Sequence, residues 1–368
     1  MDGQPFRYSN IDRVQELVHR IDQQASGHIL ADQSVTNPRV RDRFVISSLI
    51  EEAITSSQLE GASTTRPAAR EMLQSGRLPQ DRSERMILNN YEAIRAVEEL
   101  ASGAEPLTPS HVLELHRIVT RDTLDDERDA GRLQMPGDER IVVGGYDGQV
   151  VYQPPPAEEL PDRLERLCDF ANGSGADGFI HPVVRAIVLH FVLAYDHPFA
   201  DGNGRTARAL FYWSMLRSGY WLAQFLSISS ILRRDRREYA ESYLHVETDN
   251  NDVTYFVIHQ LEVIVRALKS LDEYLARKMK EQRDAELLLR GRADLNHRQH
   301  VLISDALRDP GATFTIQAQA NRHGVTYETA RTDLLRLEKL GLFSKTRVGK
   351  KFIFVPLPTL TGQLAADN

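Results

Sequence analysis

The stretch that decides both fold and chemistry is residues 197–208, which read HPFADGNGRTAR. The apolar spacing of residues 183–195 just before it predicts a buried helix. Pro198 and Gly202 both resist helix continuation, so the stretch is predicted to be a loop that opens a new helix near Gly204. Backbone amides at a helix N-terminus point outward, and glycines let a phosphate approach them closely. The sequence therefore predicts an anion site at this loop.

The charged residues of the loop indicate what kind of chemistry this anion site serves. Arg205 and Arg208 are three residues apart, which predicts that both guanidinium groups lie on one face of the helix beside the anion. Asp201 is a carboxylate among phosphate donors and is suited to holding Mg²⁺ that bridges phosphate oxygens. His197 has the pKa range needed to take a proton from a hydroxyl. Together they predict phosphoryl or nucleotidyl transfer, and the P-loop pattern GxxxxGK[ST] is absent.

The same stretch resembles the signature of the Fic family, HPFx(D/E)GNGRxxR, and agrees with it at every specified position. The resemblance implies a helical catalytic domain with a small β-hairpin flap, which transfers AMP from ATP to a target protein. His197 would deprotonate a Ser, Thr or Tyr hydroxyl, which then attacks the α-phosphate of ATP and releases pyrophosphate. Asp201 would hold Mg²⁺, and Phe199 would anchor the loop in the core.

The resemblance also implies a set of nucleotide-binding residues. The amides of Gly202 to Gly204 would cradle the phosphates, Arg205 would bind them, and Arg208 would hold the γ-phosphate. Part of the hairpin and a tyrosine after the catalytic helix would border the nucleotide. The complete implied set is Val142, Val143, Gly144, Gly145, Gly202, Asn203, Gly204, Arg205, Thr206, Ala207, Arg208 and Tyr239.

Ser56, Glu60 and Gly61 are similar to the inhibitory motif that precedes the catalytic core in the family. From the local sequence alone, Glu60 is the solvated end of a helix. The resemblance implies instead that its carboxylate reaches Arg208 and removes the partner of the γ-phosphate. Ser56, one turn earlier on the same helix face, would fix this geometry. Autoinhibition is therefore expected, and the same Glu60 also suits the reverse reaction, removal of AMP from a target.

The fold class expected from the sequence is mainly α. Residues 141–145 and 149–152 alternate around the turn 146–148, which predicts a short β-hairpin at the place of the family's target-docking flap. Elsewhere apolar residues recur at helical spacing. Helices are predicted at 11–21, 44–59, 82–100, 109–120, 160–171, 183–195, 206–218 and 253–290.

A basic module is expected at the C-terminal end. Residues 295–355 contain ten Lys and Arg against five Asp and Glu, although the whole chain has a net charge of −7. Helices are predicted at 297–307, 315–321 and 326–340, followed by two strands around 348–350, which is the order of a winged helix. The third helix would be a recognition helix, and Lys345 to Lys351 a basic wing. DNA binding and docking of a protein partner or a second copy both agree with this composition.

These expectations divide the chain into regions. They are an N-terminal helical region with the inhibitory helix at 1–100, a Fic catalytic domain at 101–261, a helical linker at 262–294, and a winged-helix domain at 295–358.

Composition indicates a soluble, cytoplasmic protein. Of the 368 residues, 41% are hydrophobic and 26% are charged, which is the globular range. The most apolar stretch contains Arg185 and His190, so no membrane span is expected. The N-terminus lacks the pattern of a secretory signal. Cys168 is the only cysteine, which excludes disulfides within the chain and cysteine-ligated zinc.

Two classes of function stay open at this point. The first is an enzyme that modifies protein hydroxyls with AMP, including its own, or with another phosphate-linked group such as phosphate or UMP. The second is a DNA-binding regulator in which the same domain senses nucleotide.

Overall fold

The computed structural model describes residues 5–25, 38–138, 140, 143–144, 150–152, 154–175, 178–290, 294–308, 311–348 and 351–366. The chain forms two compact units, Met1–Leu271 and Asp272–Asn368. The division falls inside one long helix, within the stretch that the sequence predicts to join two domains. Among the described residues, no helix combines the length and the apolar character that a membrane crossing requires.

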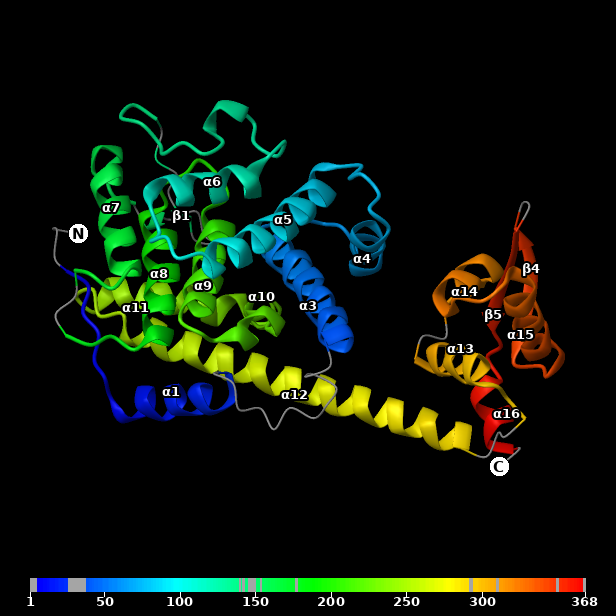
Figure 1. Ribbon diagram of the computed structural model, residues 1–368. Helices are drawn as coiled ribbons and strands as arrows, with labels where there is room; N and C mark the ends of the chain where they lie inside the picture. The colour runs from blue at the N-terminus through cyan, green and yellow to red at the C-terminus, as the bar shows by residue number, and fades with distance from the viewer. Residues whose placement is uncertain are drawn as a thin grey trace. The chain divides into compact units, whose positions relative to one another are not determined.

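The first unit is helical (Figure 1). Its α-helices are α1 (Asp12–Ala25), α3 (Pro38–Leu59), α4 (Arg66–Ser75), α5 (Arg82–Ser102), α6 (Pro109–Thr120), α7 (Leu160–Ala171), α8 (Pro182–Asp196), α9 (Asn203–Arg217), α10 (Ile228–Leu232), α11 (Arg236–Thr248) and the start of α12 (Thr254–Arg290). Three-residue to five-residue 3-10 helices lie at Glu127–Asp129, Ala157–Glu159 and Trp221–Phe225.

Helices α8 and α9 form the centre of this unit. Ten of the 15 residues of α8 and 12 of the 15 residues of α9 are buried, which is the pattern of helices surrounded on every side. They pack against each other, α5 and α6 pack on α9, and α7 packs on α8. Helix α3 packs on α5 and on the short helix α10. The loop between α8 and α9 thus joins the two central helices of the unit.

The predicted hairpin is present in its described residues. Strand β1 (Val143–Gly144) pairs antiparallel with β2 (Val150–Tyr152), and Val143 lies opposite Tyr152. Val142 and Gly145, expected to border the nucleotide, lie outside the described residues.

The second unit combines helices with a small sheet. It contains α13 (His297–Arg308), α14 (Ile316–His323), α15 (Tyr327–Lys339) and α16 (Leu360–Ala366). Strands β3 (Phe314–Thr315), β4 (Phe343–Val348) and β5 (Lys351–Pro356) form an antiparallel sheet in the order β3-β5-β4. A core that includes Leu302, Leu334, Phe343 and Phe354 joins the helices to the sheet.

The mainly helical fold class is confirmed, and most long helices lie where the sequence predicts them. Four helices were not predicted, namely α4, α10, α11 and α16. Helices α4, α10 and α16 have ten residues or fewer, and α11 begins with charged residues, so tertiary packing contributes more to their conformation than local sequence does. Helix α9 begins at Asn203, one residue before the predicted position.

Two residues in left-handed conformation enclose the α8–α9 loop. His197 has φ 45° and ends α8, and Gly202 has φ 82° and precedes α9. A Cβ atom added to Gly202 would lie 2.6 Å from Cγ2 of the buried Thr120 and 3.4 Å from the His116 ring. The start of α9 therefore needs glycine for two reasons, the sign of φ and the close approach of α6.

We expect Gly202→Ala to destabilise the protein more than Gly76→Ala. Gly76 at the end of α4 also has positive φ, at 72°, but a Cβ there meets nothing within 4 Å. Gly76→Ala should therefore lower the free energy of unfolding only by the strain of a left-handed alanine, about 1–2 kcal/mol. Gly202→Ala should lower it by a further 1–3 kcal/mol, roughly, through overpacking. Denaturant midpoints of the two variants measure the difference, and equal midpoints would contradict it.

Candidate functional site

Asn203 closes the loop between α8 and α9. Its side-chain Oδ1 accepts a hydrogen bond from the backbone N–H of Phe199 at 2.9 Å, and its Nδ2 donates to the carbonyl of Phe199 at 2.8 Å. The Phe199 ring is fully buried, as expected of a core anchor. The loop is therefore a fixed element whose amides keep their direction without a ligand.

His116 on α6 supports this loop, and the sequence analysis did not identify it. Its ring stacks on Phe199 with centroids 3.8 Å apart. Nδ1 accepts from the backbone N–H of Gly131 at 2.9 Å, so Nε2 carries the proton and donates to the carbonyl of Asp201 at 2.8 Å. Burial lowers the pKa of His116 to about 4, which keeps the ring neutral at physiological pH.

Arg140 holds the other end of the loop and was also not identified from sequence. Its guanidinium donates to the carbonyls of Asp196 at 2.8 Å, His197 at 3.1 Å and Pro155 at 2.9 Å. Carbonyls at a helix C-terminus lack partners within the helix and attract cations. Arg140 thereby ties the end of α8 to the segment that follows the β1–β2 hairpin.

The side chain of His197 is arranged as a base. Its Nδ1 lies 3.3 Å from the carbonyl of Ala194, which makes Nδ1 the protonated nitrogen and leaves the lone pair on Nε2. Burial lowers the pKa of His197 below its ordinary value. A neutral imidazole with a lone pair on one nitrogen can accept a proton from a hydroxyl at neutral pH.

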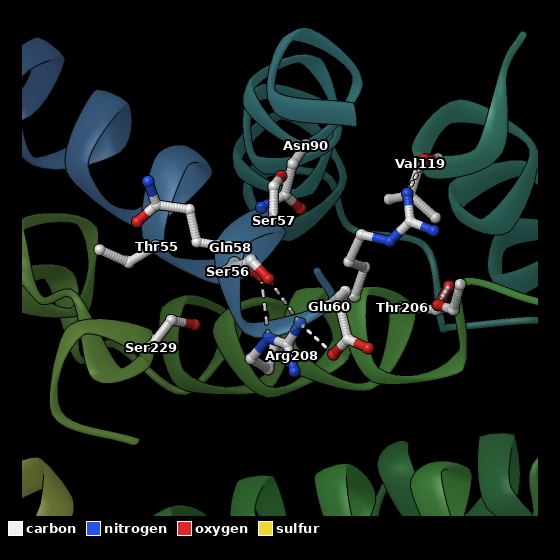
Figure 2. A network of polar contacts seen from close by, with 12 residues as sticks. Thr55, Ser56, Ser57, Gln58, Glu60, Asn90, Val119, Thr206, Arg208 and Ser229 are labelled. Carbon is white, nitrogen blue, oxygen red and sulfur yellow. Dashed lines mark hydrogen bonds and ion pairs between the residues drawn. The ribbon is translucent and has the colours of Figure 1, made fainter. Parts of the chain in front are cut away.

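Arg208, in the second turn of α9, is paired with the predicted inhibitory residues (Figure 2). Its guanidinium is 2% exposed. Nε donates to Ser56 Oγ at 2.8 Å, and Nη2 donates to Glu60 Oε1 at 2.8 Å and to the Ser56 carbonyl at 3.2 Å. Burial alone would lower the pKa of Arg208, but the carboxylate of Glu60 raises it above its ordinary value.

The carboxylate of Glu60 also lies against the first turn of α9. A Cβ added to Gly204 would be 2.3 Å from Glu60 Oε1 and 3.1 Å from Arg208 Nη1. Glu60 follows the last residue of α3, and Gly61 with φ 99° turns the chain away. An acidic group thus occupies the place where the sequence predicts phosphate.

Arg205 and Arg208 contact different partners, although the sequence predicts one shared anion site for them. Arg205 is fully buried, donates from Nη1 to the Val119 carbonyl at 2.7 Å, and lies 3.2 Å from Asp201 Oδ2 through Nη2. Arg205 therefore ties α9 to the end of α6 and to Asp201. Arg208 points to α3 instead.

Asp201 keeps a carboxylate at the surface of the site. Its side chain is 43% exposed, Oδ1 accepts from the Gly202 N–H at 2.5 Å, and Arg82 lies 3.7 Å from Oδ2. Proteins usually hold Mg²⁺ with one or two carboxylates together with substrate phosphates, so this single carboxylate beside the loop amides fits that ion. Within the described part of the chain, no three His, Cys, Asp or Glu side chains form a metal cluster by themselves.

The other predicted nucleotide-binding residues lie in the interior of α9, beside His190, and in β1. Thr206 and Ala207 are fully buried in α9, and Thr206 Oγ1 donates to the Gly202 carbonyl at 2.9 Å. The Tyr239 hydroxyl lies 3.0 Å from His190 Nε2 and 3.1 Å from the Tyr243 hydroxyl. Gly144 and its neighbour Val143 form β1.

Comparison with known proteins identifies a family. Residues 106–215 match the model of the Fic/DOC family. A protein adenylyltransferase Fic from Nematostella vectensis is 29% identical over 193 residues, which cover 52% of this chain and 39% of that protein. Protein adenylyltransferase fic-1 from Caenorhabditis elegans is 32% identical over 121 residues, which cover 33% of this chain and 22% of that protein. The chain thus spans less than half the length of these relatives.

Solved structures show the same fold. A Fic family protein from Desulfovibrio desulfuricans G20 superposes with a TM-score of 0.62 at 21% identity, covering 96% of this chain and 98% of that one. Residues 134–508 of Fic-1 from Caenorhabditis elegans superpose with a TM-score of 0.53 at 24% identity, covering 73% of each chain. The chain therefore contains a Fic/DOC family domain at residues 106–215 and has the fold of Fic proteins.

Proposed function

We propose that this chain transfers AMP from ATP to a Ser, Thr or Tyr hydroxyl of a target protein. The observation that carries the proposal is the fixed loop with a neutral His197 at one end and the N-terminus of α9 at the other. A base and an anion-binding helix N-terminus at two ends of one rigid loop suit a hydroxyl attacking a phosphate. The adenylyltransferase relatives support ATP as the nucleotide.

In this proposal each group has one task. Nε2 of His197 accepts the hydroxyl proton of the target, and the oxygen forms a bond to the α-phosphorus of ATP. The bond from that phosphorus to the bridging oxygen breaks, and pyrophosphate leaves. The amides from Gly202 to Gly204 receive the phosphates, and Asp201 would hold Mg²⁺, which would neutralise phosphate charge. Arg208 binds the γ-phosphate once Glu60 has moved away.

The proposal includes restraint of the activity by Glu60. The Glu60 carboxylate binds the guanidinium of Arg208 and lies against Gly204, where the triphosphate is proposed to bind. The carboxylate and the γ-phosphate would therefore compete for one site. The presence of both Gly202 and Arg208 favours a triphosphate held for AMP transfer over transfer of phosphate or UMP. In the AMP-bearing target the same carboxylate assists the reverse reaction by helping water to remove AMP.

A second function, DNA binding, is favoured by one feature of the second unit. In the β4–β5 hairpin, Arg347 lies opposite Phe352, and Lys345 is on the same face of β4. Both cations are exposed, Phe352 is 43% exposed, and Lys345 Nζ lies 5.6 Å from its ring centre. Two cations and an aromatic ring on one face of a hairpin suit the grooves and phosphates of DNA, although Lys345 also pairs with Glu338 at 3.1 Å. Docking of a protein partner or a second copy is the rival use of this unit.

We expect His197→Ala to lower transfer by roughly 10²- to 10⁴-fold while ATP affinity stays nearly unchanged, because the base takes a proton but does not hold the triphosphate. His197→Asn is the matched variant, since asparagine tolerates left-handed φ and cannot act as the base. Both are compared in a Glu60→Gly background with α-labelled and γ-labelled ATP. Label in protein from γ-labelled ATP, or full activity of either variant, would disprove the proposal.

Glu60→Gly is expected to increase labelling of targets and of the protein itself at least tenfold. Releasing Arg208 from a contact worth about 1.4 kcal/mol changes nucleotide occupancy tenfold. Adding Arg208→Ala should remove the gain. Glu51→Gln is the control, because Glu51 lies on the same helix but pairs with Arg66 and Arg70. Unchanged labelling at subsaturating Mg-ATP would refute the restraint.

Replacing Lys345 and Lys351 by Ala should flatten the slope of log K against log salt for duplex DNA by about 2. The control replaces Lys269 and Lys280 on α12 by Ala, which removes the same charge from another surface. A slope that falls equally in both double variants, or no duplex binding by the unaltered protein, would favour the docking role instead.

A further inference from the structure

The inhibitory helix α3 carries a second buried carboxylate, Glu52, which the proposed reaction does not use. Glu52, Ser56 and Glu60 are spaced four residues apart, so they follow one face of the helix. Glu52 is 2% exposed. A buried carboxylate is retained at this depth only when other groups compensate its charge.

Two of its partners, Ser227 and Ser229, belong to the segment that begins α10, and the Tyr212 hydroxyl on α9 also interacts with it. Ser229 Oγ donates to Glu52 Oε1 at 2.5 Å, while Ser227 Oγ and the Ser229 backbone N–H donate to Oε2 at 2.8 Å and 3.2 Å. Thr55, one turn after Glu52 on α3, adds a contact, because its Oγ1 lies 3.1 Å from Ser227 Oγ. Burial raises the pKa of Glu52, and three hydrogen bonds to its carboxyl group fix α3 to Ser227 and Ser229.

The same segment is also tied to the catalytic helix. The Tyr212 hydroxyl on α9 donates to the Leu226 carbonyl at 3.1 Å and accepts from the Ile228 N–H at 3.1 Å. Tyr212 lies one turn after Arg208 on α9. Helices α3 and α9 are therefore linked twice, directly through Arg208 with Ser56 and Glu60, and indirectly from Glu52 through residues 226–229 to Tyr212.

The second link determines where the first can form. One residue of helix advances 1.5 Å and turns about 100°, so a small slide or rotation of α3 would separate Glu60 Oε1 from Arg208. We propose that Glu52 is a positioning residue that sets the register of α3 against α9, so that Glu60 reaches Arg208. Loss of the Glu52 contacts with Ser227 and Ser229 would then loosen this register and make departure of Glu60 from Arg208 easier.

This inference rests on the proposed inhibition by Glu60, so its test measures position and nucleotide binding rather than transfer alone. Glu52→Gln keeps the shape of the side chain and removes its charge, and Glu51→Gln is the control on the adjacent position. Affinity for a fluorescent non-hydrolysable ATP analogue is measured together with hydrogen exchange of the amides at 60–62. We expect Glu52→Gln to bind the analogue about tenfold more tightly and to exchange these amides faster, with no change in the control.

A double-mutant cycle with Glu60→Gly distinguishes positioning from a general loss of structure. If Glu52 acts through Glu60, then Glu52→Gln adds nothing to analogue affinity in the Glu60→Gly background. An equal gain in both backgrounds, or no gain and unchanged exchange in the single variant, overturns the proposal. If Glu60→Gly itself leaves affinity unchanged, the inhibition by Glu60 fails, while the exchange at 60–62 still reports whether Glu52 positions α3.

Two further variants separate position from charge and guard against misfolding. The Glu52 carboxylate also attracts Arg208 electrostatically, so removing its charge would alter the electrostatic environment of Arg208 even if α3 did not move. Ser227→Ala with Ser229→Ala removes the hydroxyl donors and leaves the charge in place. Positioning predicts that this double variant also binds the analogue more tightly and exchanges 60–62 faster. Wild-type behaviour of the serine variant overturns the proposal even if Glu52→Gln fails to fold.

Discussion

The constraint on which the site depends is the need to pair a buried guanidinium. Arg208 is almost fully removed from water, and an unpaired charge at that depth is strongly unfavourable. Ser56 and Glu60 supply the pairing in this structure. A γ-phosphate in their place would supply it equally well. In the proposed function, Glu60 and the γ-phosphate therefore compete for the same guanidinium.

Around this pair, hydrogen bonds from several elements hold the loop between α8 and α9. His116 donates to the Asp201 carbonyl, Asn203 binds the Phe199 backbone, and Arg140 donates to the His197 carbonyl. Positioning that is complete before a ligand binds lowers the reorganisation that reaction would otherwise require. It also explains why His197 keeps a left-handed φ, since the surrounding contacts offset that local strain. His197 and the backbone amides of residues 202–204 are thus fixed relative to each other.

The sequence was sufficient for the loop and for the helix that follows it, because Pro198 and Gly202 act locally. The pairing of Glu60 with Arg208 came from family resemblance, since 148 residues separate the two and no local rule joins them. His116 and Glu52 were missed although both are polar residues among buried neighbours on their helices. A polar residue on a buried helix face indicates a buried hydrogen bond. The partner in that bond depends on which element packs against the face, and apolar periodicity does not specify that element.

These contacts also indicate which element must move. The loop is bound from α6, from Arg140 and within itself, so displacing it would break many contacts at once. Glu60 instead lies beyond the last helical residue, has a side chain 30% exposed, and precedes Gly61, where a Cβ would meet nothing within 4 Å. Rotation about this glycine changes the position of the carboxylate without disturbing the core. For the proposed nucleotide binding, the end of α3 is therefore the element that can leave while the loop between α8 and α9 stays in place, and the proposed role of Glu52 would set how readily it leaves.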